Sequence, residues 1–336
     1  MAKATIADIA REAGVSVTTV SRFINGNFGK MRPETRQRIE QTVARLDYRP
    51  SASARRMRQQ RTHVVGVIVG DISNVFSSLL FKGIYTQLQP AGYDVMLMNS
   101  NNSVDEERDE ISRLLSQEVD GLIIQPDCKR FSAYSPIVSA TIPLVMVDRE
   151  PDDQPGDIAK VTVDNHGSCR ALAGLLAEHG YENVVALSNI RSEISAQMPR
   201  LEGLRAGCDE HGMLMIPVEA NGHDTQWLTQ ELRALTGRLA GRTALVSLMG
   251  PMLFDTLEAL RELGLRFPED VGVVSFDDWR WSQYVRQGIH LLEQDPQRMG
   301  QEAAANLLEQ MNADADPYAF AKQTTLPVAE IPAPSI

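Results

Sequence analysis

Residues 16–25 carry hydroxyl, amide and guanidinium side chains at a spacing that suits contacts with double-stranded DNA. Arg22 can bond to O6 and N7 of guanine, Thr18 can bond to a base edge, and Val17 can pack on a thymine methyl group. Contacts with phosphates fix position without reading sequence, and we expect them from Thr5, Ser16, Ser21 and Asn25. The alternative for Arg22 is an ordinary solvated arginine.

Two short predicted helices position these side chains. Thr5 and Asp8 have the spacing of a capping box, which starts a helix that runs to about residue 13. Gly14 can turn the chain, and Ser16 can cap a second helix over residues 17–25. A third helix begins at Pro33. Two short helices joined by a glycine-containing turn predict an all-α helix-turn-helix domain over residues 1–50.

The charge distribution supports the same interpretation. Residues 1–61 hold 13 Lys and Arg against 5 Asp and Glu, a net charge of +8, while the remaining 275 residues have a net charge of −19. A basic domain on an acidic body indicates that nucleic acid is bound at one end only.

The amino-terminal motifs resemble those of the lactose-repressor (LacI/GalR) family of bacterial transcription regulators. The resemblance is carried by Thr-Ile-Ala-Asp-Ile-Ala-Arg-Glu-Ala-Gly-Val-Ser-Val-Thr-Thr-Val-Ser-Arg-Phe-Ile-Asn-Gly at 5–26, Pro-Glu-Thr-Arg at 33–36 and Asp-Tyr-Arg-Pro-Ser-Ala at 47–52, and it extends to about residue 302. It implies that the residues matching Val17, Thr18 and Arg22 read bases. It also implies a homodimer on near-palindromic operator DNA.

Residues 51–62 form a basic linker that contains Arg55, Arg56 and Arg58. The resemblance implies a hinge helix that folds on the operator and places Ala54, Arg55 and Met57 at the minor groove. Met57 stands where the family has a leucine, and an apolar side chain there can wedge between bases. The alternative is an ordinary charged linker, because short isolated helices are marginal in water.

Beyond residue 63, short apolar runs alternate with amphipathic stretches of helical length. The candidate strands are Val64–Val69, Asp94–Met98, Gly121–Gln125, Leu144–Val147, Val161–Val163, Val184–Leu187, Ala244–Leu248 and Val271–Phe276. This alternation predicts a doubly wound α/β body with parallel sheets, and roughly ten strands suggest two lobes. We expect one lobe over about 63–163 and 293–320, and the other over about 164–292 and 321–336. The resemblance implies a fold similar to periplasmic sugar-binding proteins.

Polar side chains gather after the expected strands, where two facing sheets form a ligand cleft. The candidate effector-binding residues are Ser73, Asn74, Phe76, Asn99, Arg149, Asn165, Arg200, Asp277 and Trp279. The alternative is that these residues only form turns, which favour Asn, Asp and Ser. The resemblance implies that Arg200 holds the effector, with Asp277 as its acidic partner and Phe76 as a wall. Met249-Gly250 replaces the Asn-Asp of many members, so one usual polar contact is absent.

The guanidinium groups of Arg149 and Arg200 suit a carboxylate, and Trp279 can stack on a sugar-like face. We therefore expect a sugar-acid effector such as a ketogluconate. The body segments look most like the branch that includes the 2-keto-3-deoxygluconate operon repressor. The alternatives are ion pairs of the two arginines with Asp148, Asp277 or Asp278, an effector that is a neutral sugar or nucleobase, and a stand-alone sugar-binding protein.

The remaining features argue against other classes of protein. No GxGxxG after a strand, GxxxxGK[ST], HExxH or GxSxG motif occurs, so we expect neither an enzyme nor a cofactor. Cys128, Cys169 and Cys208 form no metal-binding pattern. No apolar run is long enough for a membrane span, and no signal peptide precedes the first helix. We expect a cytoplasmic homodimer, since the chain ends without a heptad tail.

Overall fold

The computed structural model describes residues 4–24, 27–29, 31–46, 48, 61–277, 281–313 and 316–336. The predictions for Asn25, Ala54, Arg55, Met57 and Trp279 concern residues outside this described part of the chain. The chain forms two compact units, Met1–Thr62 and His63–Ile336.

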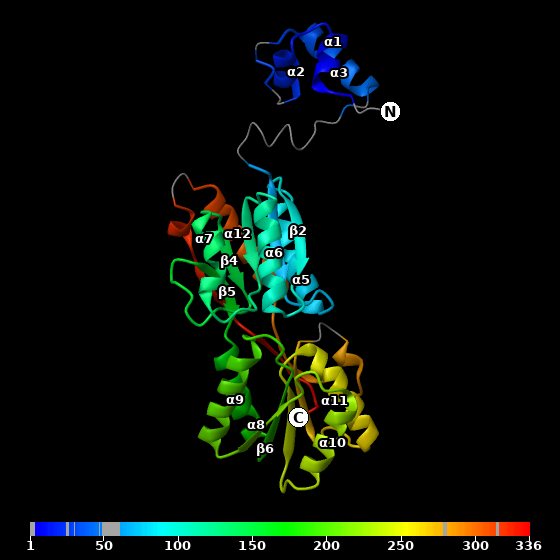
Figure 1. The fold of residues 1–336 in the computed structure, drawn as a ribbon. Coiled ribbons are helices and arrows are strands. Elements are labelled where there is room, and N and C mark those ends of the chain that lie inside the picture. Colours follow the sequence, from blue (N-terminus) through cyan, green and yellow to red (C-terminus); the bar gives the residue numbers. More distant parts are fainter. Residues whose placement is uncertain are drawn as a thin grey trace. The chain divides into compact units, whose positions relative to one another are not determined.

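The amino-terminal unit is a three-helix domain (Figure 1). Its helices are α1 (Ile6–Glu12), α2 (Val17–Ile24) and α3 (Pro33–Arg45). The Thr5 hydroxyl accepts from the backbone N–H of Asp8, and the Asp8 carboxylate accepts from the backbone N–H of Thr5, which confirms the capping box. Gly14 turns the chain at φ 63°. Side chains from all three helices form the core, namely Ile9, Ala10, Ala13, Val20 and Ile39. The predicted helix-turn-helix is confirmed.

The N-lobe of the second unit is a parallel sheet covered by helices on both faces. The sheet has the order β11-β5-β4-β3-β1-β2. Its strands are β1 (Val64–Val69), β2 (Asp94–Asn99), β3 (Gly121–Ile124), β4 (Leu144–Val147), β5 (Ala159–Val163) and β11 (Gln323–Leu326). Its helices are α5 (Val75–Leu88), α6 (Val104–Ser116), α7 (Ser135–Ser139), α12 (Pro296–Met311) and the short η1 (Phe131–Tyr134) and η3 (Pro317–Phe320). One core lies under α5 and α12, and the other under α6 and α7.

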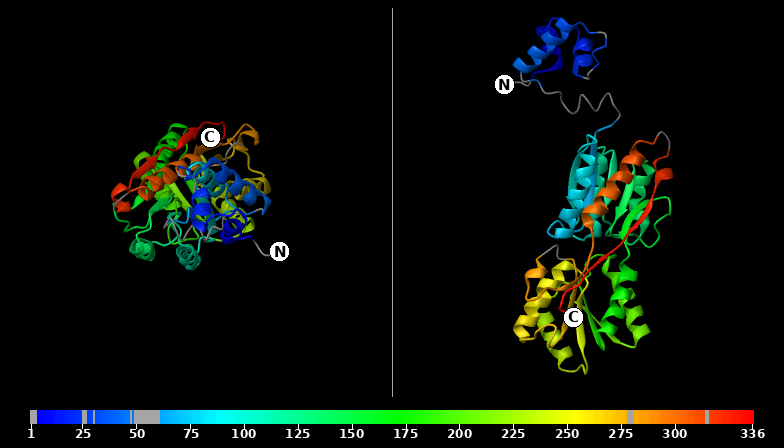
Figure 2. Two further views of the ribbon diagram at one scale, coloured as in Figure 1. Left: turned by 90° about the horizontal axis from the view of Figure 1, so that it is seen from above. Right: turned by 180° about the vertical axis from the view of Figure 1, so that it is seen from behind.

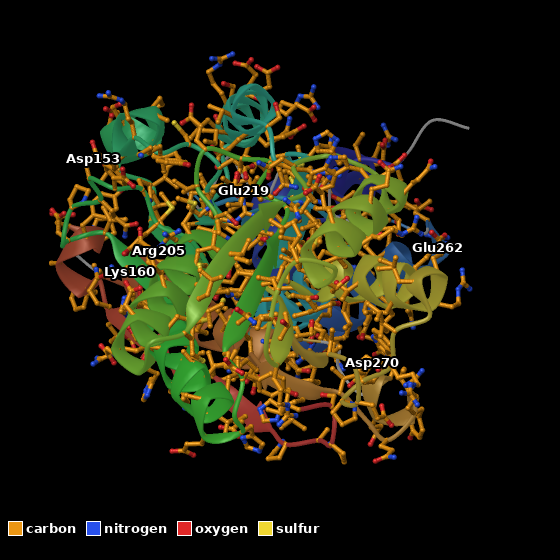
Figure 3. All side chains as sticks on the ribbon, turned by 90° about the horizontal axis from the view of Figure 1, so that it is seen from below. Asp153, Lys160, Arg205, Glu219, Glu262 and Asp270 are labelled. Carbon is orange, nitrogen blue, oxygen red and sulfur yellow. The ribbon has the colours of Figure 1, made fainter. Side chains whose placement is uncertain are left out.

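The C-lobe repeats this architecture. Its sheet has the order β12-β10-β9-β8-β6-β7, parallel except for the antiparallel pair β10–β12. Its strands are β6 (Asn183–Ser188), β7 (Leu214–Glu219), β8 (Thr243–Ser247), β9 (Gly272–Phe276), β10 (His290–Glu293) and β12 (Ala329–Ile331). Its helices are α8 (Asn165–Glu178), α9 (Gln197–His211), α10 (Thr225–Thr236), α11 (Gly250–Leu263) and the short η2 (Ser282–Tyr284). Arg205 on α9 and Glu262 on α11 lie on opposite sides of the strands (Figure 3).

The chain passes between the lobes after β5, after β10 and after β11, and Figure 2 shows the last of these crossings from behind. The expected lobe boundary near residue 320 is wrong for β11, which pairs with β5 in the N-lobe sheet. The sequence pattern also predicted no strand for β7, β10, β11 or β12. β10 is an interior strand of four residues, and its two leucines lie between His290 and Glu293, too short an apolar run to stand out. The other three are edge strands: β7 is apolar but largely exposed and contains a proline, and β11 and β12 have exposed polar positions.

The helices α5 and α12 pack closely against each other. A Cβ atom at Gly83 would lie 2.0 Å from the backbone oxygen of Gln297, and one at Gly300 would lie 2.2 Å from that of Leu80. Only glycine permits this approach, because any side chain would push the two helices apart.

Within the described residues, no helix has the length and apolarity needed to cross a membrane. Among the same residues, no group of three or more His, Cys, Asp or Glu side chains is arranged to hold a metal ion.

Candidate functional site

The outer face of α2 presents the three residues predicted to read bases. Val17 is 43% exposed, and Thr18 and Arg22 are exposed as well. Ser16 caps the helix, since its hydroxyl accepts from the backbone N–H of Thr19 at 3.1 Å. Because Val17, Thr18 and Arg22 are exposed, this face of α2 can contact a partner, as a recognition helix requires.

Two of the predicted phosphate contacts differ in their surroundings. Thr5 is exposed beside its capping partner, so its role stays a prediction. Ser21 is only 5% exposed, and its prediction as an outward phosphate contact is wrong. Its short side chain follows the buried Val20 and is covered where α1 and α3 pack against α2.

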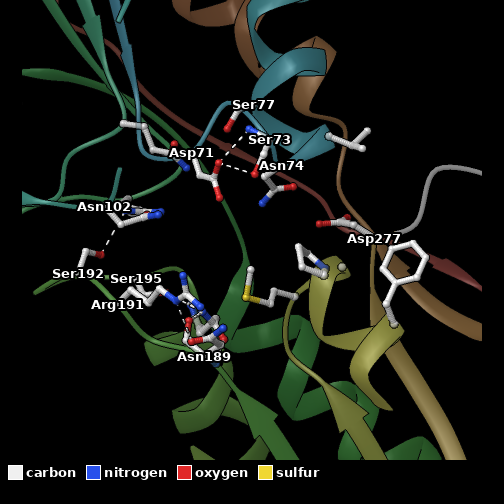
Figure 4. Close-up of a pocket in the computed structure, with 18 of the residues that line it drawn as sticks. Asp71, Ser73, Asn74, Ser77, Asn102, Asn189, Arg191, Ser192, Ser195 and Asp277 are labelled. Carbon is white, nitrogen blue, oxygen red and sulfur yellow. Dashed lines mark hydrogen bonds between the residues drawn. The ribbon is translucent and has the colours of Figure 1, made fainter. Parts of the chain in front are cut away.

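A cleft of about 510 Å³ lies between the two lobes (Figure 4). Loops that follow strands supply its walls, as expected for open α/β sheets. The N-lobe contributes polar residues that follow β1, β2, β3 and β4, which include Asp71, Ser73, Asn74, Asn102, Gln125 and Arg149. The C-lobe contributes residues that follow β6, β8 and β9, which include Asn189, Arg191, Ser192, Gln197, Met249 and Asp277.

Ser73 and Asn74 line the cleft, as predicted, and also shape the loop before α5. The hydroxyl and the backbone N–H of Ser73 donate to Asp71 Oδ1 at 2.6 and 2.8 Å. Asn74 caps α5, because its Oδ1 accepts from the backbone N–H of Phe76 at 3.0 Å. Both side chains thus face the cleft from a fixed loop.

Arg149 pairs with a buried carboxylate of its own lobe and also bonds to the C-lobe. Its Nη1 donates to Asp127 Oδ1 at 2.6 Å and to Ser192 Oγ of the C-lobe at 3.2 Å, and its Nη2 donates to Asn102 Oδ1 at 3.0 Å. Asp127 is fully buried. The ion-pair alternative is therefore found for Arg149, but with Asp127 as the main partner, while Asp148 lies 3.7 Å away.

Arg200 lies at the base of the cleft and is buried. Its Nε donates to Asn165 Oδ1 at 2.7 Å, its Nη1 donates to the Leu248 backbone oxygen at 2.7 Å, and its guanidinium lies 3.8 Å from the ring centre of Phe276. Burial lowers the pKa of Arg200, and the nearby Asp277 carboxylate opposes this effect. The contacts fix the orientation of the guanidinium toward the cleft floor.

Asp277 lies between Arg200 and the cleft at the end of β9, in a left-handed backbone conformation of φ 47°. Its two carboxylate oxygens accept from the backbone N–H and the side-chain amide of Gln294 at 2.7 and 2.6 Å. Burial raises the pKa of Asp277 to about 6, although Arg200 and the Gln294 bonds act in the opposite direction.

Three of the predicted effector contacts lie behind the cleft. Phe76 is buried in the N-lobe core and borders only a small recess beneath the main cavity. Asn99 does not line the cavity, because its side chain accepts from the backbone N–H of Ile72 at 2.9 Å and donates to Asn101 at 2.6 Å. Asn165 is buried and holds Arg200. The predictions of Asn99 and Asn165 as cleft residues are wrong, since both side chains point into supporting bonds.

Arg191 was missed by the sequence analysis. It is exposed, lines the cleft, and donates from Nε to Asn189 Oδ1 at 3.3 Å. No ion pair is found for it within the described part of the chain. Its position three residues after β6 is the same strand-end signal that pointed to Arg149.

Comparison with known proteins places these features in a family. Residues 5–51 match the sequence model of the bacterial regulatory proteins of the lacI family, and residues 173–330 match that of a periplasmic binding protein-like domain. The chain is 30% identical over 314 residues to the HTH-type transcriptional regulator KdgR of Bacillus subtilis, which covers 92% of both chains. It is 29% identical over 313 residues to the regulator PtxS of Pseudomonas putida, which covers 93% of this chain and 91% of that one.

The fold agrees with solved structures. The lac repressor dimer bound to operator and the anti-inducer ONPF has a TM-score of 0.85 at 23% identity and covers 99% of both chains. The transcriptional regulator CelR–cellobiose complex has a TM-score of 0.68 at 24% identity, again with 99% of both chains covered. Fold and sequence together show that this chain is a DNA-binding transcriptional regulator that belongs to the lacI family of bacterial regulatory proteins.

Proposed function

We propose that the protein is a cytoplasmic repressor that forms a homodimer. Its two amino-terminal domains bind the half-sites of a near-palindromic operator, and the cleft of each subunit binds a small sugar acid. The observation that carries the proposal is the combination of an exposed recognition helix with a polar cleft between two lobes. Binding in the cleft then changes operator affinity through a coupling free energy of about 1–3 kcal/mol.

The DNA contacts follow from the exposed face of α2. Val17, Thr18 and Arg22 read base edges in the major groove, where a guanidinium recognises guanine and an aliphatic group recognises thymine. Phosphate contacts come from the exposed Thr5 and Ser16 and from Asn25. Ala54, Arg55 and Met57 enter the minor groove as a hinge.

The chemistry of the cleft supports a sugar acid as effector. Arg191 is a solvent-exposed cation on the cleft wall, and its fork geometry suits a carboxylate. Hydroxyl and amide groups of Ser73, Asn74 and Asn102 suit sugar hydroxyls. The three cleft carboxylates each accept a bond from a neighbouring side chain: Asp71 from Ser73, Asp277 from Gln294 and Asp255 from Thr225.

Gel shifts on the DNA upstream of this gene and its neighbours test the DNA-binding part, with random duplex as competitor. Calorimetric titration of the full-length protein with gluconate, 2-ketogluconate and the neutral sugar glucose tests the effector part. The acids should bind at least about tenfold more tightly than glucose. A neutral sugar that binds as tightly as the acids would overturn the sugar-acid assignment and leave the regulator intact.

A further inference from the structure

The cleft has two unlike halves. One half is polar and closed, because Arg149 bonds to Ser192 across the lobes and the backbone N–H of Lys129 donates to Glu193 at 3.0 Å. The other half carries the apolar side chains of the cleft, together with Asp255 and Asp277. It is bordered by Val75 of the N-lobe, which is 52% exposed, and by Phe254 and Trp281 of the C-lobe.

An aromatic pair forms the wall of the apolar half. The rings of Phe254 and Trp281 stack with their centres 4.5 Å apart and their planes inclined by 18°. Phe254 lies on α11 and is 59% exposed. Since Trp281 covers one face of its ring, the exposed area belongs to the other face and the edge, which adjoin the cleft that Phe254 lines. An aromatic face held in this way is a platform for a flat, partly apolar ligand group.

The size of the cleft leaves room for such a group. A cavity of about 150 Å³ already takes up a single benzene ring, whereas this cleft measures about 510 Å³. Bonds of Arg149 and Lys129 join the two lobes on the polar side, and Val75 and Phe254 line the same cleft with exposed apolar surface. A ligand with a single ring-sized unit therefore leaves much of this volume unfilled.

We propose that the effector has two units: an acidic unit held by Arg191 beside Arg149, and a second sugar ring whose apolar face stacks on Phe254. This inference rests on the proposed effector-binding role of the cleft and specifies the ligand class as an acidic disaccharide. The C–H face of a sugar ring is apolar while its edge carries hydroxyls. Asp255, which borders the cleft next to Phe254 and accepts from Thr225 at 2.8 Å, can bond to such an edge.

Calorimetric titration of the full-length protein with three probes tests this inference: gluconate, cellobionate (which adds one glucose ring to gluconate) and cellobiose, which lacks the acid. Cellobionate should bind about tenfold more tightly than gluconate, a difference of ~1.4 kcal/mol. Phe254→Ala should weaken cellobionate more than gluconate and so abolish this difference, whereas Phe254→Tyr keeps the ring and should keep the difference. Phe320→Ala is the matched control, because Phe320 is 47% exposed and does not line the cleft.

Each outcome separates this inference from the proposed function. Equal affinity for gluconate and cellobionate, or an equal loss for both in Phe254→Ala, overturns the second-ring site while a sugar-acid effector stands. Binding of cellobiose but of neither acid overturns the sugar-acid assignment, and the aromatic site then stands only if Phe254→Ala weakens cellobiose. Binding of none of the three overturns both.

Discussion

Replacing Asp127 by Asn removes a negative charge from beneath the cleft while it keeps the shape of the side chain. Asp127 is fully buried, accepts from Arg149 at 2.6 Å and also accepts from the hydroxyl of Ser100. The substitution leaves Arg149 without its main counter-charge. We expect the body of the protein to lose stability for this reason, since no other carboxylate lies within hydrogen-bonding distance of that guanidinium among the described residues.

The structure sets the magnitude of the loss. Removing one partner of a buried ion pair costs about 3–5 kcal/mol. The side chain of Arg149 is 13% exposed, keeps its bond to Asn102 and lies 3.7 Å from Asp148, so part of its charge stays compensated. The expected loss is therefore at the lower end, ~3 kcal/mol. For the unit His63–Ile336, that corresponds to a fall in Tm of about 5 °C.

Thermal unfolding and urea unfolding of the full-length protein, followed by circular dichroism, measure the loss. Asp105→Asn is the matched control, because Asp105 pairs with Arg108 at 2.7 Å on the surface and its side chain is 82% exposed. That control should cost less than about 1 kcal/mol. The double variant D127N/R149M should recover part of the loss, since it leaves no unpaired buried charge. Equal shifts for Asp127→Asn and Asp105→Asn would refute the reasoning.

Three further predictions concern DNA, effector and pH. Arg22→Ala should weaken specific operator binding by about 1–3 kcal/mol per half-site contact and spare salt-sensitive binding to random DNA in gel shifts; an equal loss on every sequence would mean a phosphate contact only. Arg191→Gln should weaken sugar-acid binding about tenfold without changing neutral-sugar binding in calorimetry. Burial raises the pKa of Glu107 from 4.5 to about 7, so the folded state binds this proton more tightly and the free energy of unfolding falls as pH rises through that range. In Glu107→Gln, the urea concentration at the unfolding midpoint should therefore change less between pH 5 and 7.5 than in the unmodified protein. An unchanged pH dependence would exclude Glu107 as the cause.

The sequence by itself determined the elements whose signals are local. The capping box of Thr5 and Asp8, the turn at Gly14 and the helix start at Pro33 each depend on residues within about four positions, so the pattern identifies them directly. Most central strands were also predictable, because burial on both faces demands continuous apolar runs. The interior strand β10 was missed, since its apolar run is only two residues long. The two-lobed fold and the recognition helix follow from these elements.

Only the tertiary structure decided which partner each polar side chain meets. Asp127 and Arg149 lie on neighbouring strand ends, yet nothing in their spacing selects that pair over Asp148. The lobe to which β11 belongs, the burial of Ser21 and the stacking of Phe254 on Trp281 likewise depend on segments far apart in the chain. Helix caps and turns depend on residues that are close in the sequence. Ion pairs, cleft walls and edge strands depend on residues that are far apart in the sequence and come together only when the chain folds.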